Sequence, residues 1–194
     1  ALSNTEPVFE PFGFKGFPIP ALSGRAKLKV AGANELSVTE IVARASDEDV
    51  AGSLSVRRLG DRHVVGGDLK VSRIDLSGFG VLLGGRAATI TPEGAIWPNG
   101  PFAVVEGARN SRGRVHVETP IVLVNGGTFL SDVSFDVSWT PTENRVRNLI
   151  GTRGQGEVTA DISLCCYGST AQKQMSGRFS FEEIDMDDLV PDAI

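Results

Sequence analysis

The sequence predicts an all-β fold: an elongated or curled antiparallel sheet of two repeated strand units, with few short helical turns. Apolar and polar residues alternate along several segments, as they do in strands with one buried face. The chain contains 23 glycines and many Val, Ile, Thr and Ser residues, which suits short strands joined by turns. A strand pattern also recurs after about 110 residues. These observations favour a single β-rich domain over residues 1–194.

Charge and hydropathy exclude some classes of protein. The net charge of -5 gives no basic surplus for a nucleic-acid partner. No apolar run reaches the roughly 18 residues that a membrane span needs. The chain begins at Ala1 without an initiator Met or signal peptide, and it ends just after a patterned segment. We therefore expect a fragment of a larger protein whose anchoring or targeting signal is missing.

The first half of the chain contains the first set of predicted strands. The Phe- and Pro-rich segment 6–20 should be extended and packed on an edge. Alternation or β-branched residues then predict strands over residues 23–30, 38–42, 53–56 and 68–72. The segment 58–62 separates two alternating runs and contains Gly60, so it predicts a hairpin turn. Residues 80–110 are rich in Gly and Pro and are expected to form loops with one helical turn at most.

The second half of the chain also predicts strands joined by turns. Asn125-Gly126-Gly127 predicts a hairpin, because Asn-Gly supplies the positive φ that tight turns need. Alternation predicts strands over residues 132–139 and 158–166, and Phe179 and Phe181 continue the pattern. The segment 167–170 is a further predicted turn.

The segment 140–151 allows two interpretations. Thr140, Pro141 and Glu143 have the spacing of a helix start, and Gly151 could end the helix. The earlier copy of this segment, residues 38–42, is too β-branched for a comfortable helix. By analogy we predict a turn over 140–144 and a strand over 145–150, with the helix as the alternative.

An internal repeat supports this choice. Gly67 to Leu76 aligns with Gly177 to Met186, and both copies contain two alternating apolar residues followed by Ile-Asp. We predict two units of about four strands, around residues 22–79 and 129–190. A loop-rich connector is expected between them at 80–128.

These repeated phrases resemble the AsmA-like family of bacterial envelope proteins (AsmA/TamB type). Residues 47–56 (DEDVAGSLSV) resemble the family's acidic turn followed by a small-residue strand. Residues 65–76 resemble its next strand and its leucine-aspartate-leucine ending, residues 177–189 resemble the same ending, and residues 133–149 resemble its preceding strand pair. The adjacent Cys165 and Cys166 depart from the pattern.

The resemblance covers residues 20–79 and 115–190. It implies a periplasmic module of a protein anchored in the bacterial inner membrane through a segment that is missing here. It also implies a curled sheet with an apolar inner face that takes part in phospholipid movement and outer-membrane homeostasis. Phospholipid or acyl chains, and further segments of the parent protein along the sheet edges, are the partners it implies.

The alternation itself predicts an apolar face with few helices to cover it, so a second sheet, the sheet's own curl or an acyl chain must do so. Ordinary core packing is the alternative for each of its residues. The predicted lipid-facing residues are Leu54, Val56, Leu69, Val71, Val133, Phe135, Val137, Ile162, Leu164, Phe179 and Phe181.

Motifs for nucleotide binding, metal binding or catalysis are weak in this sequence. Gly78-Phe79-Gly80 with Gly84 only loosely resembles a dinucleotide loop, because prolines interrupt the helix that should follow. His63, in a predicted turn, and His116, on a polar strand face, have no metal-ligand spacing. We predict no catalytic residue, no metal and no cofactor.

Two charged clusters each allow two interpretations. Arg109, Arg112 and Arg114 favour a solvated strand entrance, with lipid phosphate as an alternative contact. The acidic end favours a solvated face over a calcium site, because it lacks the EF-hand glycine and spacing. Its residues are Glu182, Glu183, Asp185, Asp187 and Asp188.

The side chains of adjacent strand residues point to opposite faces, so Cys165 and Cys166 are badly placed to bond each other. They are predicted to be packing residues, with a redox or metal role as the alternative.

The function predicted first is a non-enzymatic lipid-handling module. An envelope scaffold or protein-interaction module without lipid is the alternative, and an enzyme ranks third.

Overall fold

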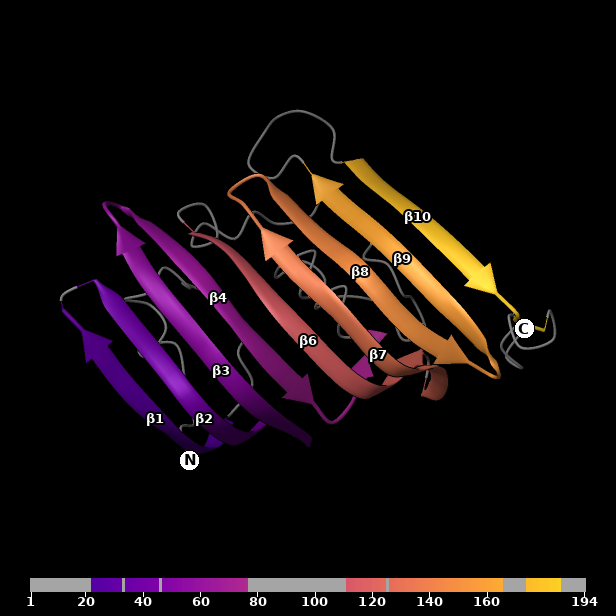
Figure 1. Cartoon of the computed structure of the whole chain (residues 1–194), viewed down its shortest axis with the longest axis horizontal. Coiled ribbons are helices and arrows are strands. Elements are labelled where there is room, and N and C mark those ends of the chain that lie inside the picture. The colour runs from indigo at the N-terminus through magenta and orange to yellow at the C-terminus, as the bar shows by residue number, and fades with distance from the viewer. Residues whose placement is uncertain are drawn as a thin grey trace, which may run out of the picture.

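The computed structural model describes residues 22–32, 34–45, 47–76, 111–124, 126–165 and 174–185. Within these ranges the chain forms one open sheet, with β1 at one edge and β10 at the other (Figure 1). The strands are β1 (Leu22–Ala31), β2 (Glu35–Ala45), β3 (Glu48–Leu59), β4 (Arg62–Val71), β5 (Ile74–Asp75), β6 (Ser111–Val124), β7 (Gly127–Trp139), β8 (Glu143–Arg153), β9 (Gly156–Cys165) and β10 (Gln174–Glu182). The predicted all-β class is confirmed.

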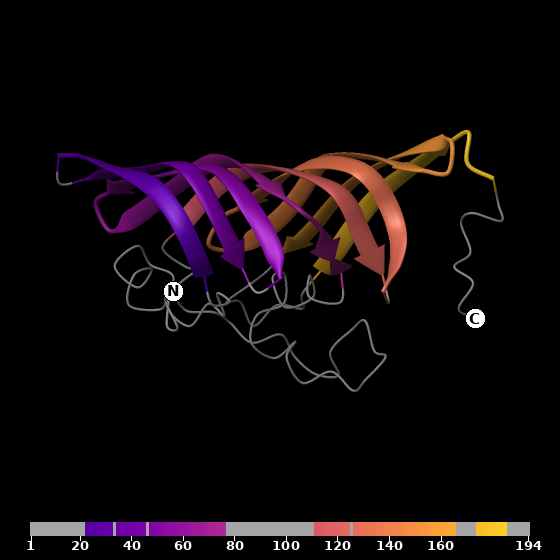
Figure 2. The same cartoon turned by 90° about the horizontal axis from the view of Figure 1, so that it is seen from below.

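The sheet is antiparallel except at its centre. Its order is β1-β2-β3-β4-β6-β7-β8-β9-β10, and β4 and β6 run parallel, with the short β5 also parallel to β6. Antiparallel neighbours need only short turns, whereas a parallel pair needs a long crossover, and here the chain between β4 and β6 supplies it. The strands twist and bend, so the sheet is strongly curved (Figure 2).

Two predicted hairpins are confirmed. Leu59 pairs with Arg62 across Gly60, whose φ is 67°. Val124 pairs with Gly127, and Gly126 has a φ of 80°. Both glycines adopt a backbone conformation that residues with a Cβ avoid. The predictions for segments 6–20, 80–110 and 167–170 lie outside the described residues.

The segment that allowed two interpretations is a strand. Residues 143–153 form β8, which pairs with β7 and β9 along its length. A tight turn precedes it, in which Thr140 N donates to the carbonyl of Glu143 at 2.8 Å and Thr142 N donates to Oγ1 of Thr140 at 3.3 Å. The Pro and Thr that resembled a helix start belong to this turn.

The repeat-like strand arrangement is confirmed by the pairing register. The pair Leu54–Gly67 of β3 and β4 corresponds to the pair Ile162–Gly177 of β9 and β10. The register of β2 with β3 shifts between Val38 and Ile41, and that of β8 with β9 shifts at the corresponding place, between Val146 and Leu149. Strands β7 to β10 therefore reproduce strands β1 to β4.

The prediction of a loop-rich connector over 80–128 is wrong for residues 111–124. These form β6, a strand of 14 residues that joins the two units. Gly113 and Pro120 interrupt its alternation, so its pattern was weak in the sequence. Pairing with β4 on one side and with β7 on the other stabilises β6 despite this weak pattern.

The core lies on the second unit and β6. Eight buried side chains form one cluster: Val115, Val117, Val122, Leu130, Val133, Phe135, Val146 and Val158. Partly buried side chains of the first unit, including Leu54, Leu69 and Val71, pack against this cluster. Ile74 and Ile184, which end the two copies of the repeat, also pack against it.

The prediction for the cysteines is wrong at Cys165, which is disulfide-bonded. The prediction assumed that the extended backbone continues through both cysteines. Strand β9 ends at Cys165, and Cys166 lies outside the described residues.

Candidate functional site

The eleven residues predicted to share an apolar face do share one. A cross-strand row runs from β3 to β9 through Leu54, Gly67, Val115, Val137, Val146 and Ile162. Each of the remaining predicted residues lies an even number of positions from a member of this row or its continuation on its own strand. Since side chains alternate along a strand, all eleven point to the same side of the sheet.

Their exposure divides them into a centre and a margin. Phe135 in β7 is 4% exposed, and Val133 and Leu164 are similarly buried. Leu54, Val56, Leu69, Val71, Val137 and Ile162 are partly buried. Phe179 and Phe181 in the edge strand β10 are 56% and 47% exposed. The central residues are thus packed, and a ligand could reach this face at its margins.

Further apolar side chains of the same face are exposed in both edge strands. Leu28 and Val30 of β1 are 70% and 71% exposed, and Met175 of β10 is 60% exposed. Leu28 continues the row of Leu54 through Val38, and Met175 pairs with Leu164. The alternation of residues 23–30 indicated Leu28 and Val30, but these were not among the predicted lipid-facing residues. Only their edge position makes them accessible.

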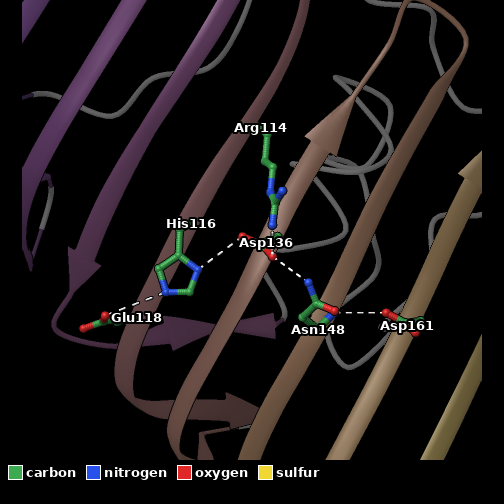
Figure 3. A network of polar contacts seen from close by, with 6 residues as sticks. All are labelled: Arg114, His116, Glu118, Asp136, Asn148 and Asp161. Carbon is green, nitrogen blue, oxygen red and sulfur yellow. Dashed lines mark hydrogen bonds and ion pairs between the residues drawn. The ribbon is translucent and has the colours of Figure 1, made fainter.

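The opposite face carries a polar network centred on Asp136 of β7 (Figure 3). Arg114 of β6 donates from Nη2 to Oδ2 of Asp136 at 2.8 Å, and Asn148 of β8 donates from Nδ2 to the same oxygen at 2.8 Å. Nδ1 of His116 lies 3.2 Å from Oδ1. The backbone N–H of Asn148 in turn donates to Oδ1 of Asp161 in β9 at 3.0 Å. One carboxylate therefore ties three strands together.

The network extends toward the first unit. Glu118 of β6 forms an ion pair of 2.7 Å with Lys70 of β4, and Nε2 of His116 lies 3.7 Å from its other oxygen. Gly67, Asp68, Arg114, His116 and Asp136 line a shallow, open hollow of about 540 Å³ beside it. No local pattern in the sequence predicts this network, because its members come from different strands and meet only through the pairing register of the sheet.

Hydrogen bonding dominates the electrostatics of Asp136. The hydrogen bond from Arg114 lowers the pKa of the Asp136 carboxyl to about 2, with smaller contributions from Asn148 and His116, against burial that raises the pKa. The ion pair with Lys70 lowers the pKa of Glu118 and raises that of Lys70. These carboxylates are ionised and already paired, which is the signature of a structural network rather than of a proton donor.

The other sequence candidates are not brought together. Arg112 is exposed, Arg114 is engaged by Asp136, and Arg109 lies outside the described residues. His63 is the second residue of β4, one position beyond its predicted turn, and pairs with Arg58 in β3. His116 lies on the polar face, as the alternation predicts.

The acidic end and the glycine motif are only partly described. Glu182, Glu183 and Asp185 are exposed, whereas Asp187, Asp188 and the Gly78–Gly84 motif lie outside the described residues. In the described ranges, no group of three or more His, Cys, Asp or Glu side chains is placed to hold a metal ion. Nor does that part of the chain contain a helix long and apolar enough to cross a membrane.

Comparison of the chain with protein-family models, with curated proteins and with solved structures finds no match.

Proposed function

We propose that this chain is a non-enzymatic, AsmA-like module of the bacterial periplasm that contacts acyl chains through its apolar sheet face. In this proposal it contributes to phospholipid transport and outer-membrane homeostasis, and its parent protein is anchored in the inner membrane. One observation carries the proposal: the apolar face extends from β1 to β10 and is solvent-exposed at both margins.

The exposed margin has the chemistry that hydrocarbon requires. Leu28, Val30, Met175, Phe179 and Phe181 all lie on the apolar side and are about half or more exposed. Covering an apolar side chain of this size fully contributes about 1.5–3 kcal/mol, and part of that remains available here. An acyl chain that covers several of these side chains would gain this binding free energy without any directed hydrogen bond.

Native mass spectrometry of the purified chain, with extraction of bound lipid, tests the proposal. We expect retained phospholipid that is lost when Phe179→Asp and Phe181→Asp are combined. Both side chains are exposed, so the double variant should fold, which circular dichroism will check.

The chain offers a matched control on the other face. Val42 and Ile150 are exposed to a similar extent, 51% and 45%, but lie in the row of Glu118 on the polar side. The double variant with Val42→Asp and Ile150→Asp should keep the lipid. Equal loss in both double variants, or an empty wild-type protein, would contradict the proposal.

A scaffold or protein-interaction module is the second candidate. It is favoured by the two outer strands, since the side chains of β10 are exposed along its whole length and no described strand pairs with its outer edge. Such edges readily add a further strand. A protein partner that copurifies with lipid-free protein would favour this function over the first.

A further inference from the structure

In the internal repeat, the counterpart of β10 is β4, which pairs with a strand on both of its sides. The pairs Val56–Val65 and Gly52–Leu69 of β3 and β4 correspond to Leu164–Met175 and Ala160–Phe179 of β9 and β10. Thus β10 occupies in the second unit the place that β4 occupies in the first. The difference is on the outer side: β4 pairs in parallel with β6, whereas no described strand pairs with β10 there.

The residues of β4 and β10 differ in solvent exposure in the same way. Most residues of β4 are partly or fully buried, and Val65 is among the buried core residues. All nine residues of β10 are exposed, including three large apolar side chains that a neighbouring strand would cover. The outer edge of β10 is therefore exposed, whereas the corresponding edge of β4 is covered by β6.

We propose that the outer edge of β10 binds an extended peptide segment of a partner protein, which pairs with β10 in parallel as β6 pairs with β4. The segment alternates apolar and polar residues, with its apolar residues on the side of Phe179 and Phe181. Backbone hydrogen bonds supply affinity and the alternation supplies the register. This inference does not depend on whether the apolar face contacts lipid.

The register of β4 with β6 specifies the chemistry of the partner. Gly67, Asp68 and Lys70 lie opposite Val115, His116 and Glu118. The corresponding residues of β10 are Gly177, Arg178 and Ser180. Arg178 stands where β4 has Asp68, so the partner should carry a carboxylate at the position where β6 carries His116.

A second copy of the chain is a poorer occupant. Its free edges are β1, whose polar face carries Arg25, Lys27 and Lys29, and β10, whose polar face carries Arg178 itself. These cations would approach the side of β10 that presents Arg178, and like charges on adjacent strands are destabilising.

The chain itself supplies the probe. A fluorescent synthetic peptide of residues 111–124 should bind the full chain in lipid-free buffer, as measured by anisotropy. The same peptide with His116→Glu should bind about two- to fivefold more tightly, because it places an opposite charge beside Arg178. A peptide of equal composition with the alternation destroyed should not bind.

Crosslinking then reports the orientation. In the parallel register, Gln174 lies beside peptide residue Arg112, and Ser180 lies beside Glu118. With cysteines at these positions, a short thiol crosslinker should join Gln174→Cys to Arg112→Cys and Ser180→Cys to Glu118→Cys. An antiparallel peptide would exchange these partners, which are separated by about 20 Å along a strand.

Two variants locate the site. Phe179→Lys with Phe181→Lys should weaken peptide binding at least tenfold, whereas Val42→Lys, an exposed position on the inner strand β2, should leave it unchanged. Absence of binding, exchanged crosslinks, or crosslinking of one chain to another instead of to the peptide would each overturn the proposal. Loss of lipid binding alone would overturn only the lipid-handling function.

Discussion

Asn148 donates a hydrogen bond of 2.8 Å to Asp136 from a β-bulge, and its backbone φ is 53°. Its counterpart in the first unit is Glu40, which has a φ of 51° and forms an ion pair with Lys27 on the preceding strand. In both units, the side chain of the bulge residue contacts a side chain on the preceding strand. The position is shared, and only the chemistry of the contact differs.

The bulge at Asn148 should be sensitive to substitution. Asn148→Ala removes the donor to Asp136 and places a less tolerant residue at positive φ, so we expect a loss of about 1–3 kcal/mol of unfolding free energy. Asn148→Gly removes the same donor but accepts the backbone conformation, and it should lose less. Urea denaturation of both variants measures the difference. If glycine destabilises more than alanine, backbone strain does not contribute at this position.

The lowered pKa of Asp136 predicts a dependence of stability on acid. The carboxyl is held at a pKa of about 2 by Arg114 first, whereas an unfolded Asp titrates near 3.9. Its contribution is therefore complete above about pH 4 and is lost as the pH falls toward about 2. It amounts to about 2 kcal/mol at most, less at high salt, because the side chain of Arg114 is largely exposed.

Asp136→Asn tests this dependence by urea denaturation between pH 5 and 2. The stability gap between the wild type and this variant should narrow as the pH falls. Asp132→Asn, which removes a carboxylate from an exposed residue of the same strand, is the control. A gap between the wild type and Asp136→Asn that stays constant over this pH range would refute the assigned role of the carboxylate.

Two phenylalanines of the same face should respond differently to truncation. Phe135 is 4% exposed in the core cluster, so Phe135→Ala should cost about 3–5 kcal/mol of unfolding free energy. Phe181 is 47% exposed on the edge strand, and Phe181→Ala should cost less than about 1 kcal/mol. Thermal or urea unfolding compares them. Similar losses would mean that β10 is packed more tightly than its exposure indicates.

Gly113 provides space for the indole of Trp139. A Cβ at this position would lie 2.5 Å from two ring atoms of Trp139 and 2.7 Å from the carbonyl of Val65. We expect Gly113→Ala to destabilise the sheet by about 1–3 kcal/mol. It should also disturb the hydrogen bond from Nε1 of Trp139 to the buried Ser111, which measures 3.0 Å.

Tryptophan fluorescence checks this second effect in a Trp97→Phe background, which leaves Trp139 as the sole tryptophan. The emission of the Gly113→Ala variant should shift to longer wavelength as the indole becomes more hydrated. An unchanged spectrum and unchanged stability would show that the backbone of β6 can move away without cost.

Local pattern was sufficient for much of the fold. Alternation predicted the strands that contain Val133 to Trp139 and Val158 to Leu164, and the Asn-Gly pair predicted the hairpin before them. The repeat also settled the interpretation of β8 correctly, against its helix-like start. These features depend on neighbours in the chain, so a single sequence contains them.

The polar network required the folded sheet. Arg114, Asp136, Asn148 and Asp161 belong to four different strands, and a one-residue change in register would separate them. The same is true of β6, whose interrupted pattern is stabilised by the strands on either side of it.

The sequence by itself determined the all-β class, the repeated strand units and which residues share the apolar face, because a period of two assigns each side chain to a side. Only the tertiary structure decided which of those residues are accessible. Phe135 and Phe181 have the same pattern in the sequence, yet one is buried at the centre and the other exposed at the edge. Exposure depends on the order of strands in the sheet, and that order is fixed by long-range pairing that no local pattern encodes.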